Sequence, residues 1–275
     1  MFTEATVDPK ETIRSKDVLI PALLVLGQAK RLGVGGLSSH QIQHALEPAM
    51  ILSEKDKEKM SDRTTRFSRT VRNALVSHQM LEKEGWAVSA RADARTQLEI
   101  TLQGQARLFD HMLPIFKSVL PPIEMLLSQD VRPNVVEGAP RATTEQVMDV
   151  ALLALALAQD ASGGASVSPT AVRRVAKGLP TLQVAPEDIE PLPSHKAGRL
   201  DRTFRNITSS HDVLVKAGFA KRDADGLSMS DEGKAHLLNA YVLRYLPSPS
   251  SLEAASARLE NEQAHHPARR RAPGL

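Results

Sequence analysis

The chain has 275 residues, of which 41% are hydrophobic and 24% are charged, values typical of a globular protein with room for two domains. It contains no cysteine, which excludes disulfides, thiolate zinc sites and thiol catalysis. The net charge is only +3, but the positive charge is clustered, and such clusters are typical of proteins that bind an anionic partner.

Targeting segments are not apparent. The N-terminus lacks the basic-then-apolar layout of a signal peptide. The longest apolar run, residues 150–158, has about half the length that a membrane-spanning helix needs. We therefore expect a cytoplasmic protein with no membrane partner.

Two similar apolar segments each predict a first helix. Residues 22–29 (ALLVLGQA) resemble residues 151–158 (ALLALALA), and both segments are followed by a pair of glycines. A serine then stands where a second helix would begin, Ser38 in one copy and Ser168 in the other. Pro169 occupies the first helical position, where a missing N–H costs nothing.

A polar connection follows each second helix, at residues 48–62 and 177–195, and four prolines predict that the later one is irregular. Next come residues 66–86 and 199–219, which share ten identities in 21 positions without a gap. Most of these identities are polar. A repeat that only needed to pack would keep its apolar spacing and let the charges change.

Each matched segment reads as a third helix that ends at a glycine, Gly85 or Gly218. Short strands follow in both copies, then a polar tip, a returning strand and a further helix. Three helices followed by a two-stranded hairpin is the order of a winged helix. The fold class is therefore predicted as mainly α with small β-hairpins, built as two tandem winged helix-turn-helix domains.

The predicted domain boundaries follow from these repeats. The divisions are residues 15–110 for the first winged-helix domain, 111–144 for a helix and linker, 145–246 for the second domain, and 247–275 for a C-terminal helix and basic tail. Residues 109–127 read as helix interrupted at Pro121 and Pro122, and residues 251–263 as a short amphipathic helix.

Helical angles separate two faces of each matched segment. The inner stripe is apolar except for one histidine per copy, His78 or His211, which we expect to be buried and hydrogen-bonded. Trp86 and Phe219 are expected to pack beneath their hairpins. The outer face kept its residues, whereas the inner stripe changed at three of five positions.

The outer residues are chemically suited to duplex DNA. Arginine binds guanine edges or phosphates, asparagine pairs with adenine, and hydroxyl groups contact phosphates. A helix of this kind fits the major groove, while basic hairpin tips can lie along the backbone. The predicted DNA-binding residues are Arg63, Arg66, Arg69, Thr70, Arg72, Asn73, Ser77, Arg91 and Arg95 in the first copy, and Lys196, Arg199, Arg202, Thr203, Arg205, Asn206, Ser210, Lys221 and Arg222 in the second.

The alternative interpretation is a solvated basic face, which many helices have. The parallel retention of arginine, asparagine and serine at equal angles favours DNA contact.

The run LEKEGW at residues 81–86, followed by LEITLQG at residues 98–104, resembles the ending of bacterial winged-helix domains, in particular the N-terminal DNA-binding domain of Mrr-type restriction proteins. Both copies match in outline. The resemblance implies DNA binding with Arg66, Arg69 and Asn73 on the recognition helix. It does not imply cleavage, because no remaining segment is long enough for the nuclease domain of that family.

These observations predict a protein that binds double-stranded DNA in a sequence-specific way and is associated with the nucleoid or a plasmid. The first choice of biological role is a bacterial, phage or plasmid transcription regulator. A plasmid replication initiator or partition protein is the first alternative, and a winged-helix protein–protein interaction subunit of a chromosome-organising complex is the second. No enzyme motif, metal site or cofactor is expected. A homodimer could form through the inter-domain or C-terminal helices.

Overall fold

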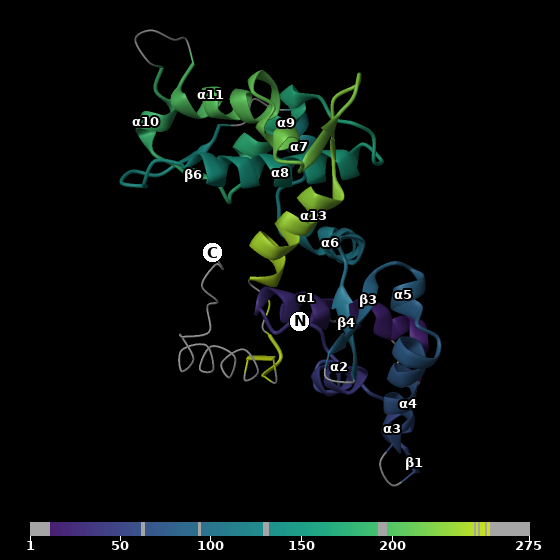
Figure 1. Cartoon of the computed structure of the whole chain (residues 1–275). Helices are drawn as coiled ribbons and strands as arrows, with labels where there is room; N and C mark the ends of the chain where they lie inside the picture. Colours follow the sequence, from purple (N-terminus) through teal and green to yellow (C-terminus); the bar gives the residue numbers. More distant parts are fainter. Residues whose placement is uncertain are drawn as a thin grey trace, which may run out of the picture. The chain divides into compact units, whose positions relative to one another are not determined.

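The computed structural model describes residues 12–61, 64–92, 95–128, 132–191, 197–244, 246, 248–250 and 252–253. The protein is mainly helical with small two-stranded sheets, as expected (Figure 1). It divides into two compact units, one formed by Met1–Leu108 with Leu243–Leu275 and the other by Phe109–Val242. Across the described residues, no helix has the length and apolar content needed to cross a membrane.

The first copy of the repeat lies in the first unit. Its elements, in chain order, are η1 (Ser15–Val18), α1 (Leu19–Arg31), α2 (Ser39–Leu46), α3 (Glu54–Lys57), β1 (Lys59–Ser61), β2 (Thr64–Thr65), α4 (Arg66–Arg72), η2 (Asn73–Ser77), α5 (Met80–Lys83), β3 (Ala87–Ala92), β4 (Arg95–Ile100) and α6 (Leu102–Lys117), which continues past the end of that unit.

After a connecting region, the second copy has a similar order except in the segment before α11 (Arg199–Arg205). The elements are α7 (Ile123–Ser128), β5 (Asn134–Val135), α8 (Thr144–Ala161), α9 (Pro169–Gly178), β6 (Gln183–Val184), α10 (Pro186–Ile189), α11 (Arg199–Arg205), η3 (Asn206–Ser210), α12 (Val213–Lys216), β7 (Ala220–Arg222), β8 (Leu227–Met229), α13 (Asp231–Leu237) and η4 (Leu238–Leu243).

The predicted helix starts are confirmed. The Ser38 hydroxyl accepts a hydrogen bond from the backbone N–H of Gln41 at 3.3 Å, and Ser168 caps α9 in the same way with Pro169 at the first helical position. Such caps satisfy N–H groups that lack a partner in the first helical turn. The apolar run at residues 150–158 is buried throughout, which explains its composition as a core helix.

Each hairpin gains a third strand contact from the turn between the first two helices. β3 pairs antiparallel with β4, and Leu37 bridges to Leu98 beside them. β7 pairs antiparallel with β8, and Val167 bridges to Leu227. The first hairpin has six residues per strand, so its strands extend further than expected, whereas the strands of the second have three.

A glycine joins each hairpin to the helix that follows it. A Cβ atom at Gly104 would stand 2.0 Å from the Trp86 carbonyl oxygen, and one at Gly233 would stand 2.2 Å from that of Phe219. Only glycine permits this approach. The residue three positions earlier, Thr101 in the first copy, caps the helix through the Gly104 N–H at 3.0 Å and donates its hydroxyl to the Gly85 carbonyl at 2.7 Å.

The second copy builds the same junction with a different residue. Ser230 caps α13 through the Gly233 N–H at 3.1 Å and donates its hydroxyl to the Gly218 carbonyl at 2.6 Å. Gly85 and Gly218 both have positive φ, +71° and +76°, as expected for residues just past a helix end. The same glycine and hydroxyl positions therefore recur in both copies because they build the same junction between the hairpin and the helix that follows it.

The two connections before the matched segments differ from each other and from the prediction. In the first, α3 is followed by the β1–β2 hairpin, which projects beyond α3 and α4 in Figure 1. In the second, β6 pairs in parallel with β5, and α10 follows. The second connection is thus ordered into short elements, because β5 from the predicted linker supplies a partner strand.

The region after the first copy agrees with the prediction in part. The helix is interrupted at Pro121 and Pro122, since α6 ends at Lys117 and α7 begins at Ile123. Most of the predicted helix at residues 251–263, and the basic tail, lie outside the described residues.

Candidate nucleic-acid interface

The two matched segments begin as short α-helices with different caps. The Thr65 hydroxyl accepts a hydrogen bond from the Ser68 N–H at 3.1 Å and so caps α4. Gly198 occupies the corresponding position before α11 and makes no side-chain cap. A Cβ there would lie 2.5 Å from the Ile189 carbonyl oxygen, so the chain is too close for a larger residue.

Neither segment is a continuous helix to its glycine, and this part of the prediction is wrong. Each α-helix widens into one π-helical turn, η2 or η3, and then stops at a left-handed residue. That residue is Gln79 in the first copy, with φ 47° and ψ 44°, and Asp212 in the second, with φ 48° and ψ 43°. A short helix, α5 or α12, then leads to the glycine.

Because each helix is interrupted by a π turn, the prediction that both histidines are buried is wrong. His78 and His211 are exposed rather than buried. Each stands at the end of its π turn, where its backbone N–H bonds to Asn73 or Asn206 five residues earlier. A wider turn rotates later side chains away from the angles of an uninterrupted α-helix. The other members of both inner stripes, Phe67, Val71, Ala74, Leu81, Leu200, Phe204, Ile207 and Leu214, are buried.

The two aromatic residues expected to pack beneath the hairpins, Trp86 and Phe219, are half-buried. Arg107 lies over the Trp86 ring, with its guanidinium carbon 5.5 Å from the ring centroid. Phe219 stacks on His236, with 4.5 Å between ring centroids. His236 also bonds to Asp149 at 2.7 Å through Nε2.

In the first copy the predicted outer residues are accessible. Arg66, Arg69, Arg72 and Ser77 are exposed, and Asn73 is half-buried. Arg69 makes a 4.0 Å contact with the Met60 sulfur of the β1–β2 hairpin. The Thr70 hydroxyl donates to the Arg66 carbonyl at 3.1 Å, so it remains an acceptor for an incoming donor.

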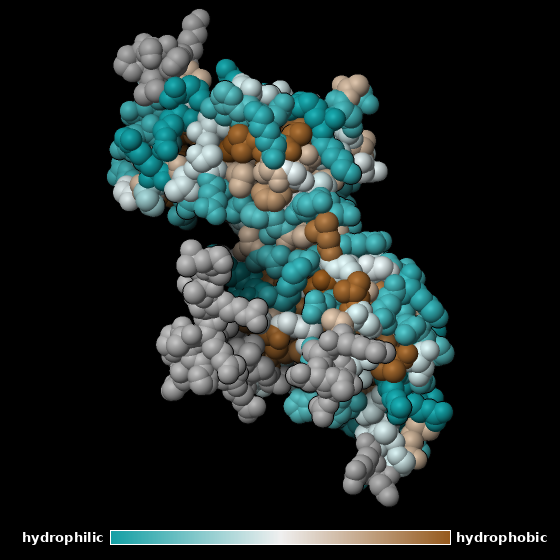
Figure 2. Space-filling view, viewed as in Figure 1, coloured by the Kyte–Doolittle hydropathy of each residue, from teal (hydrophilic) through white to brown (hydrophobic). Residues whose placement is uncertain are grey.

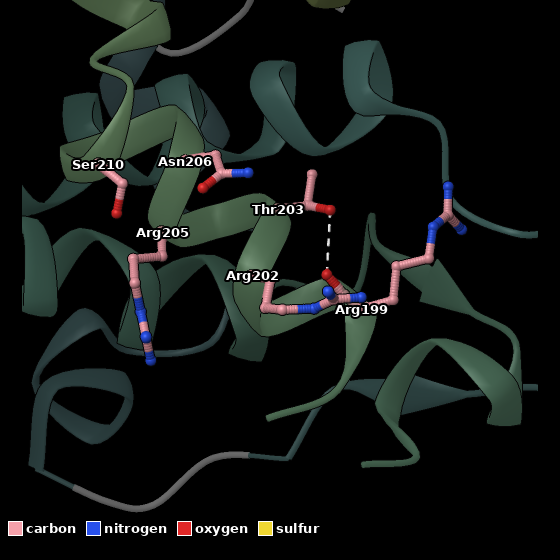
Figure 3. Close-up of a pocket in the computed structure, with 6 residues that line it drawn as sticks. All are labelled: Arg199, Arg202, Thr203, Arg205, Asn206 and Ser210. Carbon is pink, nitrogen blue, oxygen red and sulfur yellow. Dashed lines mark hydrogen bonds between the residues drawn. The ribbon is translucent and has the colours of Figure 1, made fainter. Parts of the chain in front are cut away.

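In the second copy the outer residues enclose an open polar hollow of about 520 Å³. Its lining consists of Arg199, Arg202, Thr203, Arg205, Asn206 and Ser210, all of them among the predicted residues (Figure 3). The guanidinium of Arg199 extends away from the other labelled side chains. The Thr203 hydroxyl donates to the Arg199 carbonyl at 3.0 Å, as Thr70 does in the first copy.

The hollow combines an unpaired hydrogen-bond donor with an excess of positive charge. Arg202 Nε is buried and has no hydrogen-bond partner among the described residues. Burial, and then the nearby charge of Arg205, lower the pKa of Arg173, against an opposing effect of Asp201. Positive groups are therefore crowded here, which favours an anionic ligand.

Arg173 was missed by sequence reasoning. It lies on α9, and its Nη1 contacts the hydroxyls of Thr208 at 3.2 Å and Ser209 at 3.3 Å on η3. No periodic pattern within α9 could have identified it, because its place beside Arg205 depends on packing between two helices.

The remaining predicted contacts have different surroundings. Lys221 and Arg222 are exposed on β7, but Arg222 Nη2 donates to the Thr208 carbonyl at 2.7 Å and pairs with Asp212 at 2.5 Å. Arg63 and Lys196 lie outside the described residues, as do the side chains of Arg91 and Arg95.

The visible surface is mainly hydrophilic, with isolated hydrophobic patches (Figure 2). Within the described residues, no group of three or more histidine or acidic side chains could hold a metal ion. The arrangement thus offers arginine, amide and hydroxyl groups on one face of each matched segment, with chemistry suited to phosphates and base edges. No protein-family model, curated protein or solved structure matches this chain.

Proposed function

We propose that the protein binds double-stranded DNA through its two matched segments, α4–η2 and α11–η3, each acting as the recognition helix of a winged helix. The observation that carries this proposal is the duplicated outer face. Arginine, asparagine and serine recur there at matching positions, and in the second copy all six retained outer residues line one hollow.

The surroundings of each segment support the same function. A recognition helix needs to be rigid at its inner face and accessible at its outer face, and both segments combine a buried apolar stripe with accessible polar residues. Each is followed in sequence by an antiparallel hairpin, β3–β4 or β7–β8, whose basic residues would lie near the phosphate backbone. The basic surface also favours DNA over a protein partner.

A transcription regulator is the biological role that we favour, as expected from the sequence. Replication initiators and partition proteins would use the same surface, and target identification by in vitro site selection separates these roles. An interaction subunit of a chromosome-organising complex would bind protein instead. It would show no salt-dependent affinity for duplex.

The test compares Arg69→Ala and Arg202→Ala, which remove corresponding arginines from the two copies. Each is expected to weaken binding to a selected duplex by about 1–3 kcal/mol, measured by fluorescence anisotropy. Lys83→Ala and Lys216→Ala are matched controls, because these exposed lysines were also retained in both copies but lie on α5 and α12, beyond the break.

The controls remove the same charge from outside the proposed surface, so they should change affinity much less. Equal losses from the lysine and arginine variants would contradict the proposed surface. Affinity for duplex that does not change with salt would contradict DNA binding itself.

A further inference from the structure

We propose that the two copies divide their roles unequally: Arg66 contacts DNA, whereas its counterpart Arg199 is a positioning residue that anchors α11 to the buried carboxylate of Asp188. The first copy then supplies the larger share of phosphate contacts. This inference rests on the proposed DNA binding, but its anchoring part can be tested without DNA.

Each copy buries one aspartate at the same place, just before the matched segment. Asp56 is fully buried, and it accepts hydrogen bonds from the Ile13 N–H at 3.1 Å, the Ser53 N–H at 3.1 Å and the Ser53 hydroxyl at 2.6 Å. Neutral donors satisfy it entirely within the first copy. A buried carboxylate needs such donors because it has lost its hydration.

Among the described contacts, the second copy lacks two of these donors, the hydroxyl and the backbone N–H of the capping residue. Asp188 is 1% exposed and accepts from the Ala142 N–H at 2.9 Å, the counterpart of the Ile13 contact. Ala185 stands where Ser53 stands in the first copy, so no hydroxyl is present. Arg199 Nη1 fills this role by donating to Asp188 at 2.7 Å.

The backbone dihedral angles just before the two aspartates are similar. Ser53 has φ −69° and ψ 162°, and Ala185 has φ −71° and ψ 151°. In both copies the aspartate N–H bonds to the carbonyl three residues earlier, at 3.0 Å. The copies differ in two donors: the Ser53 N–H bonds to Asp56 whereas no bond joins the Ala185 N–H to Asp188 among the described contacts, and Ala185 has no hydroxyl. A serine at position 185 would restore the missing hydroxyl.

Other charges of the second copy are also paired within the protein. Asp201 forms an ion pair with Lys177, and Arg222 forms one with Asp212. In the first copy both of these aspartates are replaced by neutral residues, Ser68 and Gln79, and Ser68 bonds to Gln43 at 2.7 Å. A phosphate approaching the second copy competes with carboxylates for these cations.

Among the described residues of the first copy, no carboxylate forms an ion pair with the outer arginines. Arg66 and Arg72 are exposed and have no side-chain partner among the described residues. In the second copy Arg202 and Arg205 line the hollow, and neither forms an ion pair with another described residue. We therefore assign Arg66 to phosphate contact and withdraw Arg199 from the contact set.

The experiment compares three variants of the full chain: Arg66→Ala, Arg199→Ala, and Arg199→Ala combined with Ala185→Ser. Thermal unfolding measures anchoring. Arg199→Ala should lower the unfolding midpoint by about 5 °C, because it leaves the buried Asp188 short of a donor. The added serine should recover much of this loss, while Arg66→Ala should leave the midpoint unchanged.

The salt dependence of binding to a random duplex measures contact. Arg66→Ala should reduce the slope of log affinity against log salt by about 1, since one phosphate contact is lost. The Arg199→Ala, Ala185→Ser protein should keep the wild-type slope. This readout separates contact from folding, because a structural role alone does not change the number of phosphates neutralised.

The opposite results would overturn the inference. One is an equal loss of slope in the rescued double variant and in Arg66→Ala, which would make both arginines contacts. Another is an unchanged midpoint for Arg199→Ala, which would remove the anchor. If wild-type protein shows no salt-dependent binding, the proposed function and the role of Arg66 fail together. The midpoints still decide whether Arg199 anchors α11.

Discussion

The two copies share a backbone and differ in how they balance charge. Their left-handed residues, Gln79 and Asp212, agree within about one degree in φ and ψ although the side chains differ. Yet one buried aspartate is satisfied by a serine and the other by an arginine. Duplication has thus preserved geometry more closely than electrostatics, so identical residues at matched positions need not have identical roles.

The largest expected effect tests what the copies share, the junction between hairpin and helix. Gly104→Ala and Gly233→Ala should each destabilise the protein by about 3 kcal/mol, because the new Cβ would overlap a carbonyl oxygen and force the backbone apart. Urea unfolding monitored by circular dichroism measures the change.

Gly163→Asn is the control for this pair. Gly163 has φ +68° and no atom within 4 Å of its Cβ position, and asparagine tolerates this conformation. Its cost should remain below about 1 kcal/mol. A Gly233→Ala protein as stable as this control would show that the junction is not tightly constrained.

An intermediate effect tests the buried aspartate of the first copy. Asp56→Ala should cost about 2–3 kcal/mol, because the Ile13 and Ser53 N–H groups lose their acceptor. Ser53→Ala should cost only about 1 kcal/mol, since the Ile13 contact remains and only the cap is lost. Chemical denaturation of both variants gives the comparison, and equal costs would contradict a bridging role for Asp56.

The smallest effect concerns the turn of the second hairpin. The Ser166 hydroxyl, then the Gly226 and Asp225 N–H groups, bond to the Asp223 carboxylate and hold its pKa below the ordinary value. The folded state therefore gains stability above the unfolded pKa of about 4, and it loses this gain as the pH falls through the lower folded pKa.

When the thermal unfolding midpoint is measured as a function of pH, Asp223→Asn should therefore show a slightly smaller decrease at acid pH than the wild-type protein. Asp225→Asn is the neighbouring control, because the Asp225 side chain makes none of these hydrogen bonds. A profile for Asp223→Asn that falls as steeply as that of the control would show that the turn does not depend on the charged carboxylate.

The main features of each copy were predictable from local signals. Serine caps, the glycines after the matched segments and the apolar spacing specified the helix starts, the helix ends and most buried residues. The same reasoning grouped six outer residues of the second copy, which line one hollow. These features depend on short-range geometry, which the sequence records directly.

The sequence-based predictions failed, or missed a residue, where the surroundings of a side chain depend on the three-dimensional structure. A fixed helical angle could not anticipate the π turn that exposes His78 and His211. The contact between Arg199 and Asp188 joins residues that are 11 positions apart and lie on two different helices. Arg173 beside Arg205 depends on two helices packing together. Such contacts require the tertiary structure, because neither partner alone carries a distinctive signal.

The unequal hairpins bear on the shape of a DNA target. Strands of six residues span about 20 Å, and strands of three span about 10 Å. If both hairpins follow the backbone, the longer one covers roughly three additional base pairs, at 3.4 Å per pair along one strand. The protected region would then extend further beside one half-site than beside the other, so that an imperfect repeat with unequal flanks is the expected footprint.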